Sequence, residues 1–138
     1  MKKLIFLIAT MACMGFYANA QTASGSCKLP GTYDYVNVDY YASDGHLAVS
    51  NQSGMKITQL HITVKCTMTY QYQIQVGEKR GKYETRTETV TVCDKNFYDI
   101  NANQTTTLSD GVKSESDIKK GSNTKFEYTV TVGNPICK

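Results

Sequence analysis

The chain has 138 residues, but the first 20 have the pattern of a secretory signal, so 118 residues remain for one folded domain. Removing the two lysines of this segment lowers the net charge from +3 to +1, and such a balance argues against nucleic acid or an anionic membrane as the partner. Threonine, valine, tyrosine and isoleucine account for 41 of these 118 residues, a composition typical of β-strands and not of a helical bundle.

Segment 1–20 predicts export. Two lysines precede an almost wholly apolar stretch from Leu4 to Phe16, and the segment ends in Ala-Asn-Ala, the small residues of a cleavage site. The stretch is too short for a transmembrane helix, and no later run reaches the ~18 apolar residues of a membrane span. We therefore expect a bacterial protein of the periplasm or the extracellular space. Lipid anchoring at Cys13 is disfavoured, because Leu, Val or Ile is missing three residues upstream.

Four cysteines remain after cleavage, and an even number in a small exported chain predicts a disulfide framework. They are Cys27, Cys66, Cys93 and Cys137. Because no two of them form a C-x-x-C pair, a zinc site is not predicted. We expect Cys66 to pair with Cys93 and Cys27 with Cys137, although two other connectivities remain open. The first bridge would close a loop of about 28 residues and stabilise the fold by roughly 3–4 kcal/mol.

The first predicted elements are two strands that follow a polar N-terminal stretch. Residues 21–31 are small and polar and predict a mature N-terminus held at Cys27. Residues 32–41 alternate between apolar and polar side chains, which indicates a strand. A second short strand is predicted at 46–50, between two glycine-containing turn signals.

The strongest pattern lies at 57–76. Every even position from Leu60 to Val76 is apolar or aromatic, which predicts a long antiparallel strand with one buried face. At ~3.4 Å per residue such a strand spans roughly 55 Å. It must therefore bend between two sheets or project from the body as the arm of a hairpin.

The chain turns at 77–81 and returns at 82–93, so the predicted hairpin covers 57–93. If Cys66 lies opposite Cys93, the numbers of any two residues paired across the hairpin add to 159, and Val90 and Val92 then leave the apolar face. Sums of 158 or 160 return both valines to it and turn Cys93 away, since a slip of one residue exchanges the faces. A β-bulge near Val92 satisfies both requirements, and a second bulge is expected at Arg80-Gly81.

The rest of the chain predicts short strands at 97–100 and 105–108, and a surface loop at 109–123 with one helical turn at 114–119. A final strand at 125–132 is expected to end at Gly133-Asn134-Pro135. Six or seven short strands separated by turns predict an all-β fold, an antiparallel β-sandwich in the immunoglobulin-like style. A small β-barrel is the alternative.

No catalytic motif is recognisable. The chain lacks the nucleophile elbow, the zinc-protease helix, the phosphate loop and the dinucleotide fingerprint. We interpret His46 and His61 as exposed polar residues. The alternation places His61 on the opposite strand face from Cys66, which disfavours a Cys–His dyad between them. The sequence therefore predicts neither enzymatic activity nor a cofactor.

A calcium loop at 99–110 is an alternative that the sequence leaves open. Oxygen-bearing side chains occupy six loop positions: Asp99, Asn101, Asn103, Thr105, Thr107 and Asp110. Against this interpretation, Gln104 stands where glycine makes the sharp turn, and no helices are predicted to flank the segment. We do not predict a metal site.

Two surfaces are candidates for a partner. Six tyrosines could form a glycan-stacking platform, although core packing explains them more simply: Tyr33, Tyr35, Tyr40, Tyr41, Tyr70 and Tyr72. The hairpin tip carries charges of both signs, among them Glu78, Lys79, Arg80 and Lys82. Such charges also protect a strand edge from aggregation, but protection does not explain the length of the strand.

The functional hypothesis from the sequence is an exported, non-enzymatic β-sandwich protein that binds another protein through the hairpin tip. An inhibitor or immunity protein that neutralises a toxin or protease is its sharper form. A glycan-binding or cell-surface accessory domain is the alternative.

Overall fold

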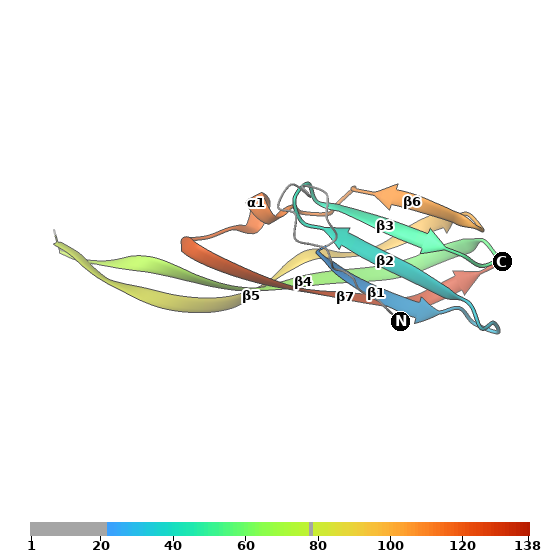
Figure 1. Cartoon of the computed structure of the whole chain (residues 1–138), viewed down its shortest axis with the longest axis horizontal. Helices are drawn as coiled ribbons and strands as arrows, with labels where there is room; N and C mark the ends of the chain where they lie inside the picture. Colours follow the sequence, from blue (N-terminus) through green and yellow to red (C-terminus); the bar gives the residue numbers. More distant parts are fainter. Residues whose placement is uncertain (1–21, 78) are drawn as a thin grey trace, which may run out of the picture.

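The computed structural model shows an almost wholly β protein built from two antiparallel sheets (Figure 1). It describes residues 22–77 and 79–138. The predicted signal segment with Cys13, and Glu78 at the hairpin turn, lie outside the described residues. The sheets form the two layers of the expected sandwich and do not close into a barrel, so the barrel alternative is wrong.

One sheet has four strands in the order β1-β2-β3-β6. They are β1 (Ala23–Lys28), β2 (Tyr35–Tyr41), β3 (His46–Asn51) and β6 (Gln104–Leu108). The last three match the predicted strands to within a few residues. The sequence pattern missed β1, because its residues are mostly small and polar and carry no apolar alternation.

The other sheet has three strands in the order β5-β4-β7. They are β4 (Ile57–Val76), β5 (Lys79–Ile100) and β7 (Ser122–Cys137), with the short helix α1 (Glu115–Ile118) in the β6–β7 connection. The strands expected at 82–93 and 97–100 are thus one continuous strand. β7 passes through the expected stop at Gly133-Asn134-Pro135, because two register shifts against β4 absorb the turn residues there.

The core lies between the two sheets and is built from alternate residues of β2, β3 and β4. Val38, Leu47 and Leu60 are each fully buried, and so are Val36, Val49 and Ile62, which lie two residues away in the same strands. β1 closes one side of this core by packing closely on β7. A Cβ atom at Gly25 would lie 2.6 Å from the carbonyl oxygen of Val130, so glycine permits this close approach.

Pairing between β4 and β5 changes register once near the cysteines. Cys66 lies opposite Val90, whereas Val64 lies opposite Cys93, and the extra residue between these pairs is Val92. The predicted bulge near Val92 is therefore confirmed. Paired positions sum to 156 on the outer side of this bulge and 157 on the inner side, so the expected sums of 158 to 160 are wrong.

The bulge separates Cys66 from Cys93. Both side chains are buried, but each faces a valine across the ladder, and both are free thiols. Cys27 lies opposite Val36 in the four-stranded sheet and Cys137 opposite Ile57 in the three-stranded sheet, and these thiols are free as well. Neither of the two predicted disulfides is present in the part of the chain that the structure describes.

Candidate functional site

The hairpin of β4 and β5 projects from the body as an arm (Figure 1). β7 accompanies β4 only as far as Gln71, which lies opposite Ser122. Beyond that point β4 and β5 pair only with each other, from Tyr72 opposite Glu84 to Val76 opposite Lys79. We call residues 72–84 the arm. Five strand residues past Gln71 correspond to a reach of about 17 Å.

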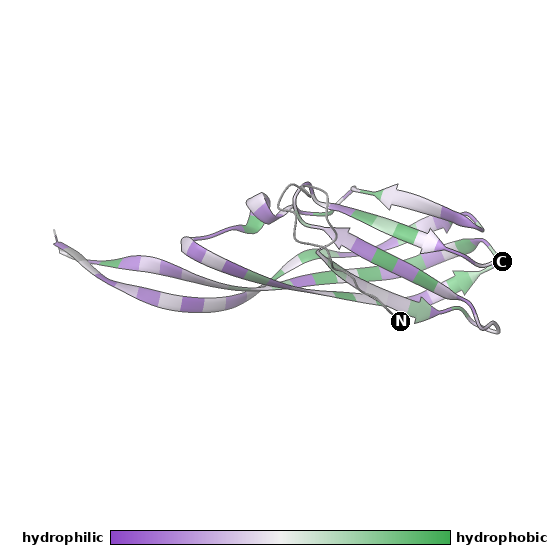
Figure 2. Cartoon of the chain, in the orientation of Figure 1, coloured by the Kyte–Doolittle hydropathy of each residue, from purple (hydrophilic) through white to green (hydrophobic). Residues whose placement is uncertain are grey.

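The arm begins where the core ends. Tyr70 is the last buried residue of β4, and the chain enters β7 directly over its ring. Gly121 has a φ of +65°, and a Cβ atom there would lie 2.4 Å from Cδ2 of Tyr70. Figure 2 shows the hydrophobic bands concentrated in the body, while the arm portion of β5 is hydrophilic. Tyr72 at the base of the arm packs partly against the core, and no described side chain from 73 to 84 does so, so burial does not account for the arm beyond its first residue.

A polar cluster anchors the base of the arm. The Tyr70 hydroxyl donates a hydrogen bond of 2.7 Å to Oε2 of Glu88, and Nζ of Lys120 lies 2.7 Å from Oε1 of the same carboxylate. Lys120, together with Tyr70, lowers the pKa of Glu88, and the Glu88 carboxylate in turn raises the pKa of Tyr70. Glu88 is thus held ionised between one aromatic residue and one cation.

The next pair along the arm repeats this arrangement. The Tyr72 hydroxyl donates to Oε2 of Glu84 at 2.8 Å and accepts from Nη2 of Arg86 at 3.1 Å. The guanidinium of Arg86 also lies 4.5 Å from the centroid of the Tyr72 ring, and contact with Tyr72 raises the pKa of Arg86. Tyrosines of β4 therefore hold the alternating charges of β5 in place on one face of the hairpin.

The opposite face of the hairpin is uncharged near the base of the arm. Thr67 lies beside Thr89, with Oγ1 atoms 3.4 Å apart, and Thr69 lies beside Thr87 at 3.2 Å. Such cross-strand threonine pairs stabilise an exposed sheet face and carry no charge. The charged face and the threonine face thus give the two sides of this hairpin different chemistry.

The structure brings the predicted tip residues to the far end of the arm. Lys79 and Lys82 are exposed there. Arg80 pairs through its backbone with Gln75, and the shift from the Gln73–Tyr83 pair confirms a bulge beside Gly81. Glu78 lies outside the described residues. Sequence reasoning missed the contacts of Tyr70 and Tyr72. Any register in which the numbers of paired residues add to an even sum places both tyrosines on the face of Glu84, Arg86 and Glu88.

Both histidines lie in local polar clusters. His61 is half-buried on the outer face of β4, with Nδ1 2.8 Å from Oδ1 of Asn96 and Nε2 2.7 Å from Oδ1 of Asp94. The contact with Asn96, followed by that with Asp94, raises the pKa of His61. Cys66 is buried on the other face, which confirms that no Cys–His dyad forms between them. His46 stacks on Tyr41, and its Nδ1 lies within hydrogen-bond distance of Asp44. Both histidines are therefore partly buried, whereas the sequence predicted that they are exposed.

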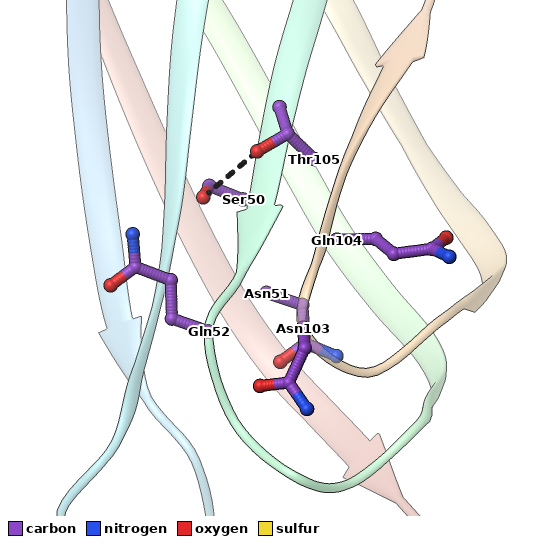
Figure 3. A pocket seen from close by; sticks show the side chains of 6 residues that line it. All are labelled: Ser50, Asn51, Gln52, Asn103, Gln104 and Thr105. Carbon is purple, nitrogen blue, oxygen red and sulfur yellow. Dashed lines mark hydrogen bonds between the residues drawn. The ribbon is translucent and has the colours of Figure 1, made fainter.

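A polar hollow of about 250 Å³ lies where β3 ends and β6 begins, and Figure 3 shows its lining side chains. Its buried member, Asn51, donates to the carbonyl oxygens of Met55 and Asn101 and accepts from the Ser53 hydroxyl at 2.7 Å. The Asn51 amide thus ties two turns together. No ionisable side chain lines this hollow, so its chemistry is structural.

The six calcium-loop positions do not converge in space. Thr105 and Thr107 belong to β6, and the two aspartates lie at its opposite ends. Asp99 lies 3.4 Å from Nζ of Lys56, and Asp110 lies 3.0 Å from Nζ of Lys95. Each carboxylate is therefore neutralised by a lysine of its own. Among residues 22–77 and 79–138, no three or more His, Cys, Asp or Glu side chains are placed to share a metal ion.

The six candidate tyrosines do not form one platform. Tyr40 and Tyr70 are buried, and Tyr41 stacks on the His46 ring with centroids 4.5 Å apart. Tyr33 is 93% exposed in the β1–β2 turn, whereas Tyr72 belongs to the arm. Tyr35, at the start of β2, is 51% exposed, and the six side chains therefore do not share one surface.

Comparison of the chain with protein-family models, with curated proteins and with solved structures finds no match. No helix in the described ranges is long and apolar enough to cross a membrane. The arm carries exposed charged residues and, beyond Tyr72, no described side chain that packs against the core, and it is the candidate functional site on structural grounds.

Proposed function

We propose that the chain is an exported, non-enzymatic β-sandwich protein that binds another protein through its arm. The observation that carries this proposal is the length of the hairpin: residues 72–84 pair only with each other and bury no described side chain. Extended hairpin backbone is costly to order without packing, so a surface that stabilises it supplies the missing contacts. An inhibitor or immunity protein is the sharper form of the proposal.

The chemistry of the arm supports a protein partner. Its exposed side chains include Lys79, Lys82 and Tyr83, and tyrosine is one of the side chains enriched at the centres of protein interfaces. The opposite signs of Lys82 and Glu84 disfavour a polyanion such as nucleic acid, which would require a run of positive charge.

The test is a shortened arm. Replacing residues 73–83 by Asn-Gly joins Tyr72 to Glu84, two residues already opposite each other, by a two-residue turn. We expect the variant to unfold at the same urea concentration as the full chain, because no buried side chain is removed. Affinity capture from envelope extract of the producing organism should recover a specific partner with the full chain and lose it with the variant.

A matched control keeps the arm and changes only its threonine face, with Thr67→Ser. This variant should retain the partner. Equal recovery by the full chain and the shortened chain would refute the role of the arm, and a partner lost equally on Thr67→Ser would place binding on the other face.

A further inference from the structure

Strand β5 is an edge strand that presents an alternating charge pattern. In the sheet order β5-β4-β7, β4 is its only neighbour among the described strands. Along the exposed edge, Glu84, Arg86 and Glu88 follow one another at every second residue on the face that carries Tyr70 and Tyr72, and Lys82 precedes them beside the bulge at Gly81. A free edge offers unpaired backbone groups, and the side chains beside it decide which strand can pair there.

We infer that this edge of β5 pairs antiparallel with the same edge of a second copy of the chain, around a two-fold axis at Thr85. The inference rests on the proposed function, which makes the hairpin the binding element, and it names a second copy as the partner of the edge strand at the base of the arm. Pairing would join the two three-stranded sheets into one continuous six-stranded sheet, the closed arrangement that a two-fold axis allows.

The charge pattern selects this register. With Thr85 opposite its own copy, Glu84 lies opposite Arg86 and Lys82 lies opposite Glu88, and the symmetry produces each of these attractive pairs twice. Moving the axis to residue 84 sets Glu84 against itself, and moving it to residue 86 sets Arg86 against itself. An axis at residue 83 or 87 keeps only one kind of attractive pair, Lys82 with Glu84 or Arg86 with Glu88, so the axis at Thr85 makes the most attractive pairs. The two-fold axis must pass through a residue and not between two residues, because only then do side chains that lie opposite each other point to the same face of the sheet.

The backbone and the opposite face are compatible with the same axis. Between its two bulges β5 pairs regularly with β4 from Tyr83 to Thr91, and Thr85 lies within that stretch. On the threonine face, Tyr83 would lie opposite Thr87 of the second copy. Tyr83 is 62% exposed in the single chain, and an aromatic residue paired with a β-branched one is a favourable cross-strand pair. The bulge beside Gly81 limits the ladder between the two copies to residues 82–88.

Charge reversal and charge exchange test the inference. Analytical ultracentrifugation of the full chain at low salt should show a dimer that weakens at about 1 M NaCl, where the Debye length falls to about 3 Å. Arg86→Glu sets like charges opposite each other twice and should raise the dimer dissociation constant at least about tenfold. The exchange variant Glu84→Arg with Arg86→Glu restores both pairs across the axis and should restore the dimer.

A cysteine at the axis supplies a second readout. Thr85→Cys should form a disulfide-linked dimer on mild oxidation, since residue 85 would face its own copy. The matched control Thr87→Cys lies on the same face, but its copy is offset by four residues, about 14 Å along the strand. It should remain uncrosslinked, with the unmodified chain as the background for the native cysteines.

Several results would overturn the inference: a monomer at all concentrations, a dimer indifferent to Arg86→Glu, an exchange variant that stays monomeric, or equal crosslinking at positions 85 and 87. These failures are distinguishable from failure of the proposed function. A monomeric chain that still captures a different protein through the arm refutes the self-pairing alone. A dimer and a captured partner that both persist in the shortened-arm variant refute the role of the arm itself.

Discussion

Two buried tyrosine hydroxyls in the core should respond in opposite directions to the same substitution. Tyr40 of β2 and Tyr128 of β7 face each other across the sheets, with ring centroids 5.1 Å apart. The Tyr40 hydroxyl donates to the carbonyl oxygen of Lys113 at 2.8 Å, whereas the buried Tyr128 hydroxyl has only the weakly polar Cys66 thiol beside it and makes no well-formed hydrogen bond to a described residue. Burial raises the pKa of both phenols, so both stay neutral at any working pH.

The magnitudes follow from these contacts. Tyr40→Phe removes a hydrogen bond and leaves the Lys113 carbonyl without it, which should lower the free energy of unfolding by about 1–2 kcal/mol. Tyr128→Phe removes a buried hydroxyl that makes no well-formed hydrogen bond, so the free energy of unfolding should rise by about 1 kcal/mol. For a chain of this size each kcal/mol corresponds to about 4 °C in Tm.

Urea denaturation followed by circular dichroism measures both variants against the unsubstituted chain. The slope m should not change, because neither substitution alters the surface exposed on unfolding. The reasoning is refuted if Tyr128→Phe destabilises the protein as much as Tyr40→Phe does, since Tyr128 would then have a partner that matters.

Three further predictions concern other parts of the fold. Gly25→Ala should destabilise the protein by roughly 1–3 kcal/mol, because its Cβ would contact the Val130 carbonyl at 2.6 Å, whereas Gly54→Ala, with no atom within 4 Å, should cost far less in the same urea titration; equal effects would contradict the close approach of β1 and β7. The pKa of His61 is raised in the folded protein, so its contacts stabilise the fold fully below the ordinary pKa of 6.5, and this stabilisation is lost as pH rises through the folded value. His61→Gln should therefore lower the urea midpoint more at about pH 5.5 than at about pH 8.5. The opposite order would count against the Asp94–His61–Asn96 cluster. Burial raises the pKa of the Cys66 and Cys93 thiols, so a thiol reagent should modify both only at the rate of unfolding, and fast labelling of either in the native protein would show that the bulge region opens locally.

Strands with an apolar alternation were predictable from the sequence, and strands without one were not. β4 was predicted to the residue because its buried face alternates without interruption from Leu60 to Tyr70. β1 was missed because its stability comes from pairing with β2 and from the contact of Gly25 with β7, neither of which leaves a periodic pattern in the sequence. β7 was predicted too short for a related reason, since neighbouring strands tolerate its bulges at the turn residues.

The candidate site shows the same division. The sequence identified the charged hairpin tip, and its parity argument predicted the bulge at Val92. It did not predict that Tyr70 and Tyr72 hold Glu88 and Glu84, because that pairing depends on a register whose position sum, 156, is two to four below the expected sums. The disulfide prediction followed from the number of cysteines, whereas each thiol's position depends on the bulge and on the sheet to which its strand belongs.

The sequence by itself determined the all-β class, the long hairpin and the alternation of charge along its return strand, since these are properties of neighbours in the chain. Only the tertiary structure decided where the pairing between β4 and β7 stops, and that β5 is an edge strand of the three-stranded sheet. Strand order is set by pairing between residues far apart in the chain, and a register differing by one residue reverses every face. The arm exists as a separate surface because β7 ends its pairing at Gln71 while β4 and β5 continue.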